Sequence, residues 1–279
     1  MQGDCSRRLN LRRRFSLLII ESVESLGDFC YAEDMRKTTF ANGEYYHIYN
    51  RGVDKREVFL DEADYERFLT CLREFNCIEA IGSLYEKYLR DKKVLVDSGG
   101  DNGGSTSIME VEPPLSQLVE IVAYCLNPNH CHFIIKQLAD DGIKKFMHRI
   151  GTAYVMYFNK KYKRSGTLFQ GKFKAIHVDS NEYLLYLSAY VNRNHFIHGY
   201  EGKILEAKPP IGGLASKIFL SDWRYCSALD YLGKRKGTLC KKDEILGQFK
   251  SPQEYGEFLD ANALHLKEKK EIQKYLLED

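Results

Sequence analysis

The sequence predicts an α+β protein whose largely antiparallel sheet has helices packed on one face. Strand-like and helix-like segments alternate along it, and two strand-like runs are joined by a tight turn. The expected order is strand, helix, loop, two strands, helix, strand and helix, which is typical of a sheet covered by helices. We expect one domain over residues 35–235 and a small, charged helical extension over residues 236–279.

The first strand and helix are predicted close to the start of this domain. The run EYYHIYNRGV, from Glu44, is rich in aromatic and branched residues and ends in Asn50-Arg51-Gly52, which predicts a strand entering a turn. Residues 61–76 carry apolar side chains at steps of three and four behind an acidic first turn. This spacing predicts an amphipathic helix.

The second half of the domain begins with a predicted hairpin. Two strand-like runs, 118–126 and 130–137, flank Asn127-Pro128-Asn129, a typical turn sequence. Over residues 142–161 the apolar residues recur at helical spacing, which predicts a helix. Beyond it, we expect a strand over residues 167–178 and a helix over residues 181–192, with Ser180 or Asn181 as its cap.

Two segments fall outside this pattern. Residues 1–34 begin with an arginine-rich stretch, and we expect either that translation begins at Met35 or that the extension is a flexible basic arm. Residues 78–115 include DSGGDNGGSTS, a composition too polar to bury a core, which predicts a loop inserted into the domain.

The composition indicates in which cellular environment the protein is expected. The eight cysteines form no CxxC pair, which favours a reducing, cytoplasmic environment over a disulfide-stapled domain. The apolar run near the start, residues 15–20, is too short to span a bilayer, and no small-residue cleavage site follows it. We therefore expect no membrane association and no secretion.

Charge is informative locally rather than in total. The 41 basic and 39 acidic residues nearly cancel, yet residues 142–178 contain no Asp or Glu. Basic and aromatic residues interleave there, which favours a groove for single-stranded nucleic acid, although a solvated basic face over a buried aromatic side would look the same. The cations that we expect to bind DNA are Lys160, Lys161, Lys163, Arg164, Lys172 and Lys174, with Arg51, Lys55 and Arg56 after the first strand.

Two histidines are candidate metal ligands. His130 and His132 flank Cys131 on a predicted strand, so the alternation of side chains directs both imidazoles to one side of the sheet. Such a pair supplies half of an open metal site that could polarise a phosphoryl oxygen. Two histidines packed or exposed on a strand without a metal are the alternative.

A tyrosine and an asparagine on the late helix could complete this site. Tyr190 and Asn194 lie four residues apart and so share a helix face. If that face covers the histidine strand, Asn194 could be the third ligand and Tyr190 a nucleophile beside the metal. Alternatively, Tyr183, Tyr186 and Tyr190 form an aromatic stripe that packs in the core.

Four blocks together make the sequence recognisable. It resembles the HUH single-strand transposases of the one-tyrosine class, and especially the REP-associated tyrosine transposases. The resemblance covers roughly residues 35–235. It rests on GEYYHIYNRGVDKREVF (43–59), NPNHCHFII (127–135), SGTLFQGKFKAIHV (165–178) and EYLLYLSAYVNRN (182–194).

The resemblance implies a role for particular residues. The family's histidine–hydrophobe–histidine motif falls on residues 130–132, its catalytic tyrosine on Tyr190 and its further metal-holding side chain on Asn194. His195 stands where relatives usually have proline, and residues 223–225 match the family's tryptophan-serine-serine only loosely.

The implied activity is cleavage and rejoining of single-stranded DNA through a 5′-phosphotyrosine, with recognition of hairpin-containing repeats. The implied cofactor is a divalent ion, Mg²⁺ or Mn²⁺, and the protein is expected to act as a monomer or a homodimer. One alternative is a domesticated protein that binds single-stranded or hairpin DNA without mobilising itself. Another is a zinc metallohydrolase using Cys125 or Cys131, although alternation directs Cys131 away from the histidines.

Overall fold

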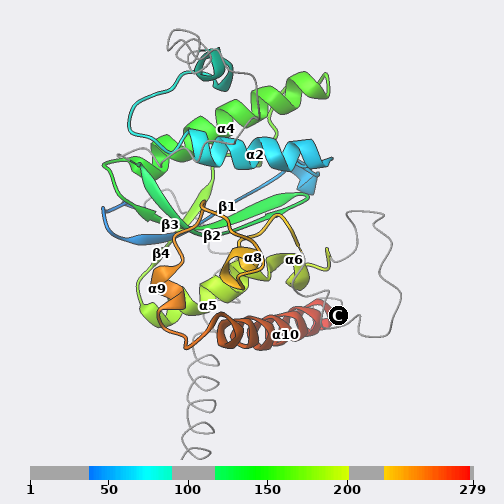
Figure 1. The fold of residues 1–279 in the computed structure, drawn as a ribbon. Helices are drawn as coiled ribbons and strands as arrows, with labels where there is room; N and C mark the ends of the chain where they lie inside the picture. The colour runs from blue at the N-terminus through cyan, green and yellow to red at the C-terminus, as the bar shows by residue number, and fades with distance from the viewer. Residues whose placement is uncertain (1–37, 90–116, 201–222, 277–279) are drawn as a thin grey trace, which may run out of the picture.

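A four-stranded antiparallel sheet forms the centre of the molecule. The computed structural model describes residues 38–89, 117–200 and 223–276, with side chains up to residue 268. The strand order is β2-β3-β1-β4 (Figure 1). The strands are β1 (Tyr45–Arg51), β2 (Val119–Asn127), β3 (His130–Gln137) and β4 (Lys174–Val178).

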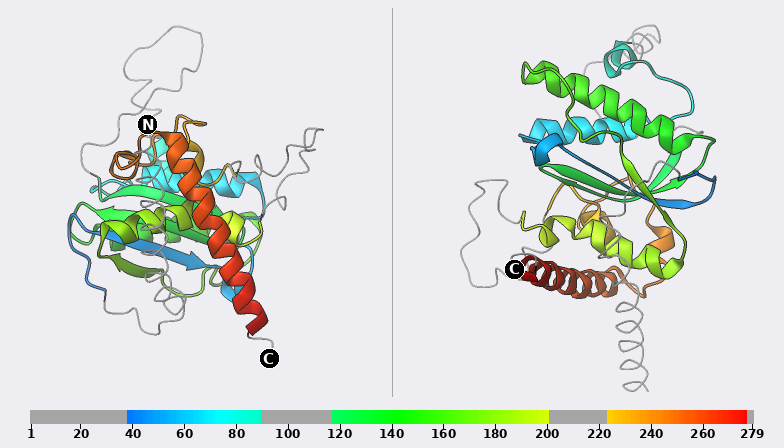
Figure 2. Two further views of the ribbon diagram at one scale, coloured as in Figure 1. Left: turned by 90° about the horizontal axis from the view of Figure 1, so that it is seen from below. Right: turned by 180° about the vertical axis from the view of Figure 1, so that it is seen from behind.

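Helices cover both faces of this sheet. The helices α2 (Glu62–Glu74) and α4 (Gly142–Lys161) lie on one face, and α5 (Asn181–Asn192) lies on the other (Figures 1 and 2). The α+β class and the antiparallel sheet are confirmed, but the expectation that helices cover only one face is wrong. The physical reason lies in β2 and β3, where successive side chains are buried, so that each face of these strands needs a cover.

Local sequence sets where these elements begin. The side chain of Asp61 accepts a hydrogen bond from Asp64 N at 3.1 Å in a capping box that starts α2. The Ser180 hydroxyl accepts one from Tyr183 N at 3.3 Å, which confirms Ser180 as the cap of α5. The fourth strand is shorter than residues 167–178, because the chain forms only an isolated bridge at Phe169 before β4.

The C-terminal helix packs onto the layer that contains α5. The long helix α10 (Pro252–Leu276) contacts both α5 and the short α6 (Asn194–Ile197) (Figure 2). Three other short elements connect the layers: η2 (Val53–Lys55), α8 (Ala228–Tyr231) and α9 (Asp243–Leu246).

Some expectations concern segments outside the described residues. They are the N-terminal extension over residues 1–34 and most of the insertion over residues 78–115. The domain boundaries at residues 35 and 235 stay predictions. Within the described ranges, we find no helix with the length and apolar character needed to cross a bilayer.

Candidate active site

Two imidazoles from β3 lie side by side on the face of the sheet that α5 covers. The ring centroids of His130 and His132 are 5.2 Å apart with perpendicular planes, and each residue is 7% exposed. The intervening Cys131 donates from its thiol to the carbonyl of Asn50 on the neighbouring strand. The structure therefore brings both histidines to the same site.

A hydrogen bond orients the first imidazole. His130 Nδ1 is 2.6 Å from Asn129 Oδ1, and Asn129 Nδ2 donates to the Lys55 carbonyl at 3.1 Å. Because the amide nitrogen of Asn129 donates to the Lys55 carbonyl, the amide oxygen of Asn129 faces the ring and accepts a hydrogen bond from His130 Nδ1–H. The other ring nitrogen, Nε2, is then left with its lone pair, as a metal ligand must be.

Two asparagine amides meet that nitrogen. Asn194 Oδ1 lies 2.9 Å from His130 Nε2, and Asn127 Nδ2 lies 2.8 Å from the same nitrogen. Asn127 Nδ2 also donates to Asn194 Oδ1 at 2.6 Å, and Asn194 Nδ2 is buried without a hydrogen-bond partner. Asn127 is an additional residue of the site, which its sequence context did not reveal because Asn127-Pro128-Asn129 is a typical turn sequence.

Tyr190 comes from α5, the helix that covers the face of the sheet with the two imidazoles. Its ring centroid is 5.4 Å from that of His132 and 6.0 Å from that of His47, nearly perpendicular to both. The residue is partly exposed, whereas Tyr186 of the same stripe is only 6% exposed. Of these two tyrosines, Tyr190 is therefore the more accessible.

The helix that carries Tyr190 does not continue through Asn194. It ends at Asn192, and Arg193 (φ −113°, ψ 12°) separates α5 from α6. Tyr190 and Asn194 therefore belong to two helices and not to one face of a single helix. Asn194 nevertheless reaches His130, because α6 contacts β2 beside the hairpin.

His47 is a third histidine that sequence reasoning did not place in the site. Its Nε2 is 2.9 Å from His132 Nδ1, and the residue is 6% exposed. Burial lowers the pKa of His47 to about 3. Burial also lowers the pKa of His132 well below its usual value, with further contributions from His47 and His130. Both imidazoles are therefore neutral and keep a lone pair near pH 7.

The donor set fits a weakly held divalent ion better than structural zinc. Among the described residues, no three His, Cys, Asp or Glu side chains converge to hold a metal. An amide oxygen is available as a third donor at the histidine pair, because Asn194 Oδ1 lies 2.9 Å from His130 Nε2. Cys125 donates its thiol to Asn127 Oδ1 at 3.5 Å, and burial raises its pKa well above the usual value, which disfavours a thiolate ligand.

The expected DNA-binding cations are divided between the two layers. Arg51 pairs with His130 in the sheet register, and Lys174 pairs with Tyr49, which itself pairs with His132. Directly paired residues of antiparallel strands share a face, so Arg51 and Lys174 point toward the imidazole side. Other expected DNA-binding cations are exposed to solvent: Lys55, Arg56, Lys163 and Lys172. Arg164 is partly exposed.

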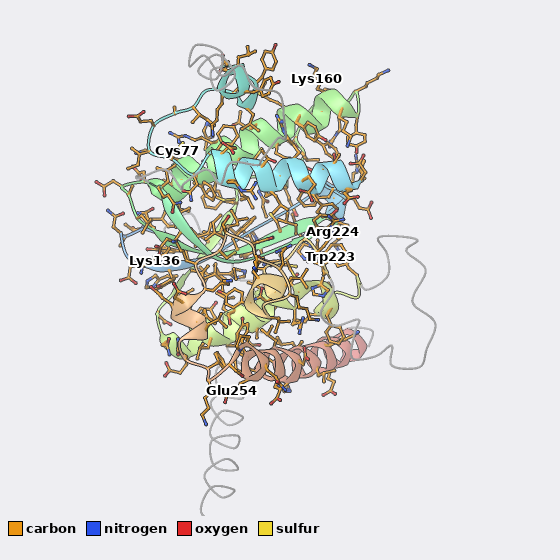
Figure 3. All side chains as sticks on the ribbon, viewed as in Figure 1. Cys77, Lys136, Lys160, Trp223, Arg224 and Glu254 are labelled. Carbon is orange, nitrogen blue, oxygen red and sulfur yellow. The ribbon has the colours of Figure 1, made fainter. Side chains whose placement is uncertain are left out.

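The cations at the end of α4 lie in the opposite layer. Lys160 projects from the outer side of α4 (Figure 3). Lys161 contacts Asp61 Oδ1 at 2.6 Å and the buried Asp64 Oδ1 at 2.8 Å. Lys161 therefore joins α4 to α2 within the fold.

Trp223 packs beside β2, next to the residue that follows Asn194. Its Nε1 donates to the Leu126 carbonyl at 3.0 Å, and its ring stacks on His195 with centroids 5.9 Å apart (Figure 3). His195, which stands in place of the family's usual proline, is therefore a packed core residue next to Asn194.

Comparison with known proteins gives a family match for part of the chain. Residues 115–194, which run from just before β2 through Tyr190 to Asn194, match the family model for IS200-like transposases. This segment of the chain is therefore similar to the IS200-like transposases. Among solved structures, it is similar to a REP-associated tyrosine transposase bound to a REP hairpin, with 14% identity, 75% of this chain and 91% of that chain covered, and a TM-score of 0.42. The comparison with curated proteins gives no match.

Proposed function

We propose that this protein is a transposase that cleaves and rejoins single-stranded DNA through a 5′-phosphotyrosine on Tyr190. The observation that carries the proposal is the position of the Tyr190 ring, 5.4 Å from the ring of His132, beside the contact between His130 and Asn194. A nucleophile next to two imidazoles and an amide oxygen is an arrangement suited to phosphoryl transfer.

The reaction conserves the phosphodiester bond energy. The Tyr190 oxygen forms a bond to the scissile phosphorus, and the bond from phosphorus to the 3′ oxygen breaks, which leaves a 3′-hydroxyl and a 5′-phosphotyrosine. Attack by a 3′-hydroxyl on that linkage rejoins the DNA and releases the phenol. Neither step consumes a nucleotide, which agrees with the absence of a GxxxxGK[ST] sequence from the chain.

The residues that would hold a divalent ion, Mg²⁺ or Mn²⁺, are His130, His132 and Asn194. They fit such an ion because His130 Nδ1 is hydrogen-bonded to Asn129, which leaves Nε2 of the neutral ring as a donor, and because Asn194 Oδ1 already lies beside that nitrogen. When bound, the ion would polarise the scissile phosphate and neutralise developing charge. The site's own residues position the phosphate under the Tyr190 ring.

The DNA partner is proposed to be a hairpin with a single-stranded flank, in keeping with the resemblance of the sequence to REP-associated transposases. Arg51 and Lys174 are the cations best placed to hold the strand near the imidazoles, since register directs both to that side. Lys55, Arg56, Lys163, Arg164 and Lys172 would extend this contact.

Trapping the covalent intermediate tests the proposal. The protein is incubated with Mn²⁺ and hairpin DNA labelled at its 3′ end, because a 5′-phosphotyrosine retains the downstream fragment. We expect a labelled protein band that survives denaturation and is abolished in Tyr190→Phe but retained in Tyr183→Phe and Tyr85→Phe. Hairpin binding without any adduct in the wild-type protein would instead support a DNA-binding protein that has lost cleavage.

A further inference from the structure

The contact between His47 and His132 constrains which nitrogen of His132 is available. The two residues come from neighbouring strands, β1 and β3, and their ring planes lie within 19° of each other. His47 Nε2 is 2.9 Å from His132 Nδ1, which is a hydrogen-bond distance between two nitrogens. One of these nitrogens must therefore carry the proton and the other must accept it.

Only one of the two arrangements is compatible with a metal ligand at His132. A neutral imidazole carries one proton. If His132 Nδ1 accepts from His47, the proton of His132 sits on Nε2 and blocks that nitrogen. If His132 Nδ1 donates to His47 Nε2, the Nε2 lone pair of His132 is free to bind a cation.

The neighbouring histidine is held in the same way. His130 Nδ1 donates to Asn129 Oδ1 at 2.6 Å, and this leaves the lone pair of His130 Nε2 beside Asn194 Oδ1, 2.9 Å away. Each imidazole of the pair therefore has a hydrogen-bond partner at Nδ1. That partner is an amide oxygen for His130 and a ring nitrogen for His132. Such partners set the tautomer and orientation of ligating histidines in metal sites.

We propose that His47 is a positioning residue that accepts the Nδ1 proton of His132 and so reserves His132 Nε2 for the divalent ion. This inference rests on the proposed function for the identity of the ligand. It adds a residue from β1, 85 positions away from His132, to the machinery of the site. In this proposal His47 acts through His132 and is not itself a ligand.

Substitutions at His47 separate hydrogen bonding from packing. His47→Phe keeps a ring of similar bulk but has no acceptor, whereas His47→Gln places an amide oxygen near the position of Nε2. His177→Phe is the matched control, because His177 is a histidine of the adjacent strand β4 that is 42% exposed in its side chain and bonds Glu44. Thermal unfolding of each variant shows whether it folds.

Nitrogen-15 NMR of the histidine rings in the full-length, metal-free chain gives the first readout. We expect His132 in the Nδ1–H form in the wild-type protein, a shift toward the Nε2–H form in His47→Phe, and recovery of the Nδ1–H form in His47→Gln. A wild-type His132 protonated on Nε2, or an unchanged tautomer in a folded His47→Phe variant, would overturn the inference.

Mn²⁺ binding, measured by electron paramagnetic resonance with the metal alone, gives the second readout. Loss of a partner behind a ligating histidine typically weakens metal affinity by about 10- to 100-fold. We expect a loss in that range for His47→Phe, a smaller loss for His47→Gln and none for His177→Phe. Equal affinity in wild type and His47→Phe would count against the role of His47. Absence of Mn²⁺ binding in the wild type would instead count against the proposed metal, while the tautomers still decide the role of His47.

Discussion

Arg193, the residue between α5 and α6, donates from Nη2 to Asp260 Oδ1 of α10 at 2.5 Å. The Arg193 side chain is 2% exposed, whereas that of Asp260 is 42% exposed. Arg193 directly precedes Asn194, so this ion pair ties the C-terminal helix to the backbone that carries a candidate metal ligand. The charged extension is therefore in contact with the site's supporting structure.

Removing the carboxylate of this pair is expected to destabilise the protein. In Asp260→Ala the buried guanidinium loses this carboxylate, and we expect the free energy of unfolding to fall by about 1–3 kcal/mol, less than for a fully buried pair because Asp260 is partly exposed. Chemical denaturation measures this. Glu257→Ala, an exposed acid on the same helix, should change stability little, and an equal loss in both variants would show that the pair has no special role.

A second link between α10 and α5 is a buried hydroxyl. Tyr255 OH donates to Ser188 Oγ at 3.1 Å and accepts from Asn192 Nδ2 at 2.9 Å. Tyr255→Phe leaves the buried Asn192 amide without this acceptor, so we expect a loss of about 1–3 kcal/mol in the free energy of unfolding. Tyr85→Phe, at a residue that is 68% exposed, is the control and should be close to neutral.

Asn194 offers a direct test of the oxygen ligand. In Asn194→Ala the amide oxygen next to His130 Nε2 is lost, and we expect Mn²⁺ affinity to fall by more than about tenfold. Asn194→Asp keeps an oxygen and adds negative charge, which hard cations favour, so affinity should be retained or raised. Titration calorimetry with Asn181→Ala as the exposed control decides between this role and a purely structural one, in which both variants at residue 194 would bind Mn²⁺ equally.

Acid is expected to destabilise the metal-free protein through His47. The pKa of His47 is lowered to about 3 by burial, so between about pH 6.5 and pH 3 the unfolded chain binds a proton that the folded chain does not. The free energy of unfolding therefore decreases as pH falls through this window, by up to about 1.4 kcal/mol per pH unit from this residue. Denaturation of wild type and His47→Phe at pH 7 and pH 5 should show a shallower dependence in the variant. An identical pH dependence would contradict this assignment.

The two groups of cations should contribute differently to DNA binding. Lys174 faces the imidazole side, whereas Lys160 lies on the outer side of α4 in the opposite layer. We expect Lys174→Ala to weaken binding of hairpin DNA and to reduce the salt dependence of log K by about 0.7 if one single-strand phosphate contact is lost. Lys160→Ala should have a smaller effect. Fluorescence anisotropy across a salt series measures both, and a larger loss in Lys160→Ala would place the DNA on the α4 side.

The local elements were predictable because their signals lie within short stretches of sequence. Helical spacing located α2, α4 and α5, and strand alternation placed His130 and His132 on one side with Cys131 on the other. The acidic first turn of residues 61–76 and the cap at Ser180 marked helix starts. Each of these signals depends only on neighbours a few residues apart.

The sequence by itself therefore determined the α+β class, most element boundaries and the pairing of the two histidines. Only the tertiary structure decided that helices cover both faces, that Asn127 and Asn194 meet at His130, and that His47 stands behind His132. These contacts join residues 64 to 85 positions apart, or depend on strand register and helix packing. Nothing in the local pattern of either partner specifies them, because burial and register are properties of the assembled sheet.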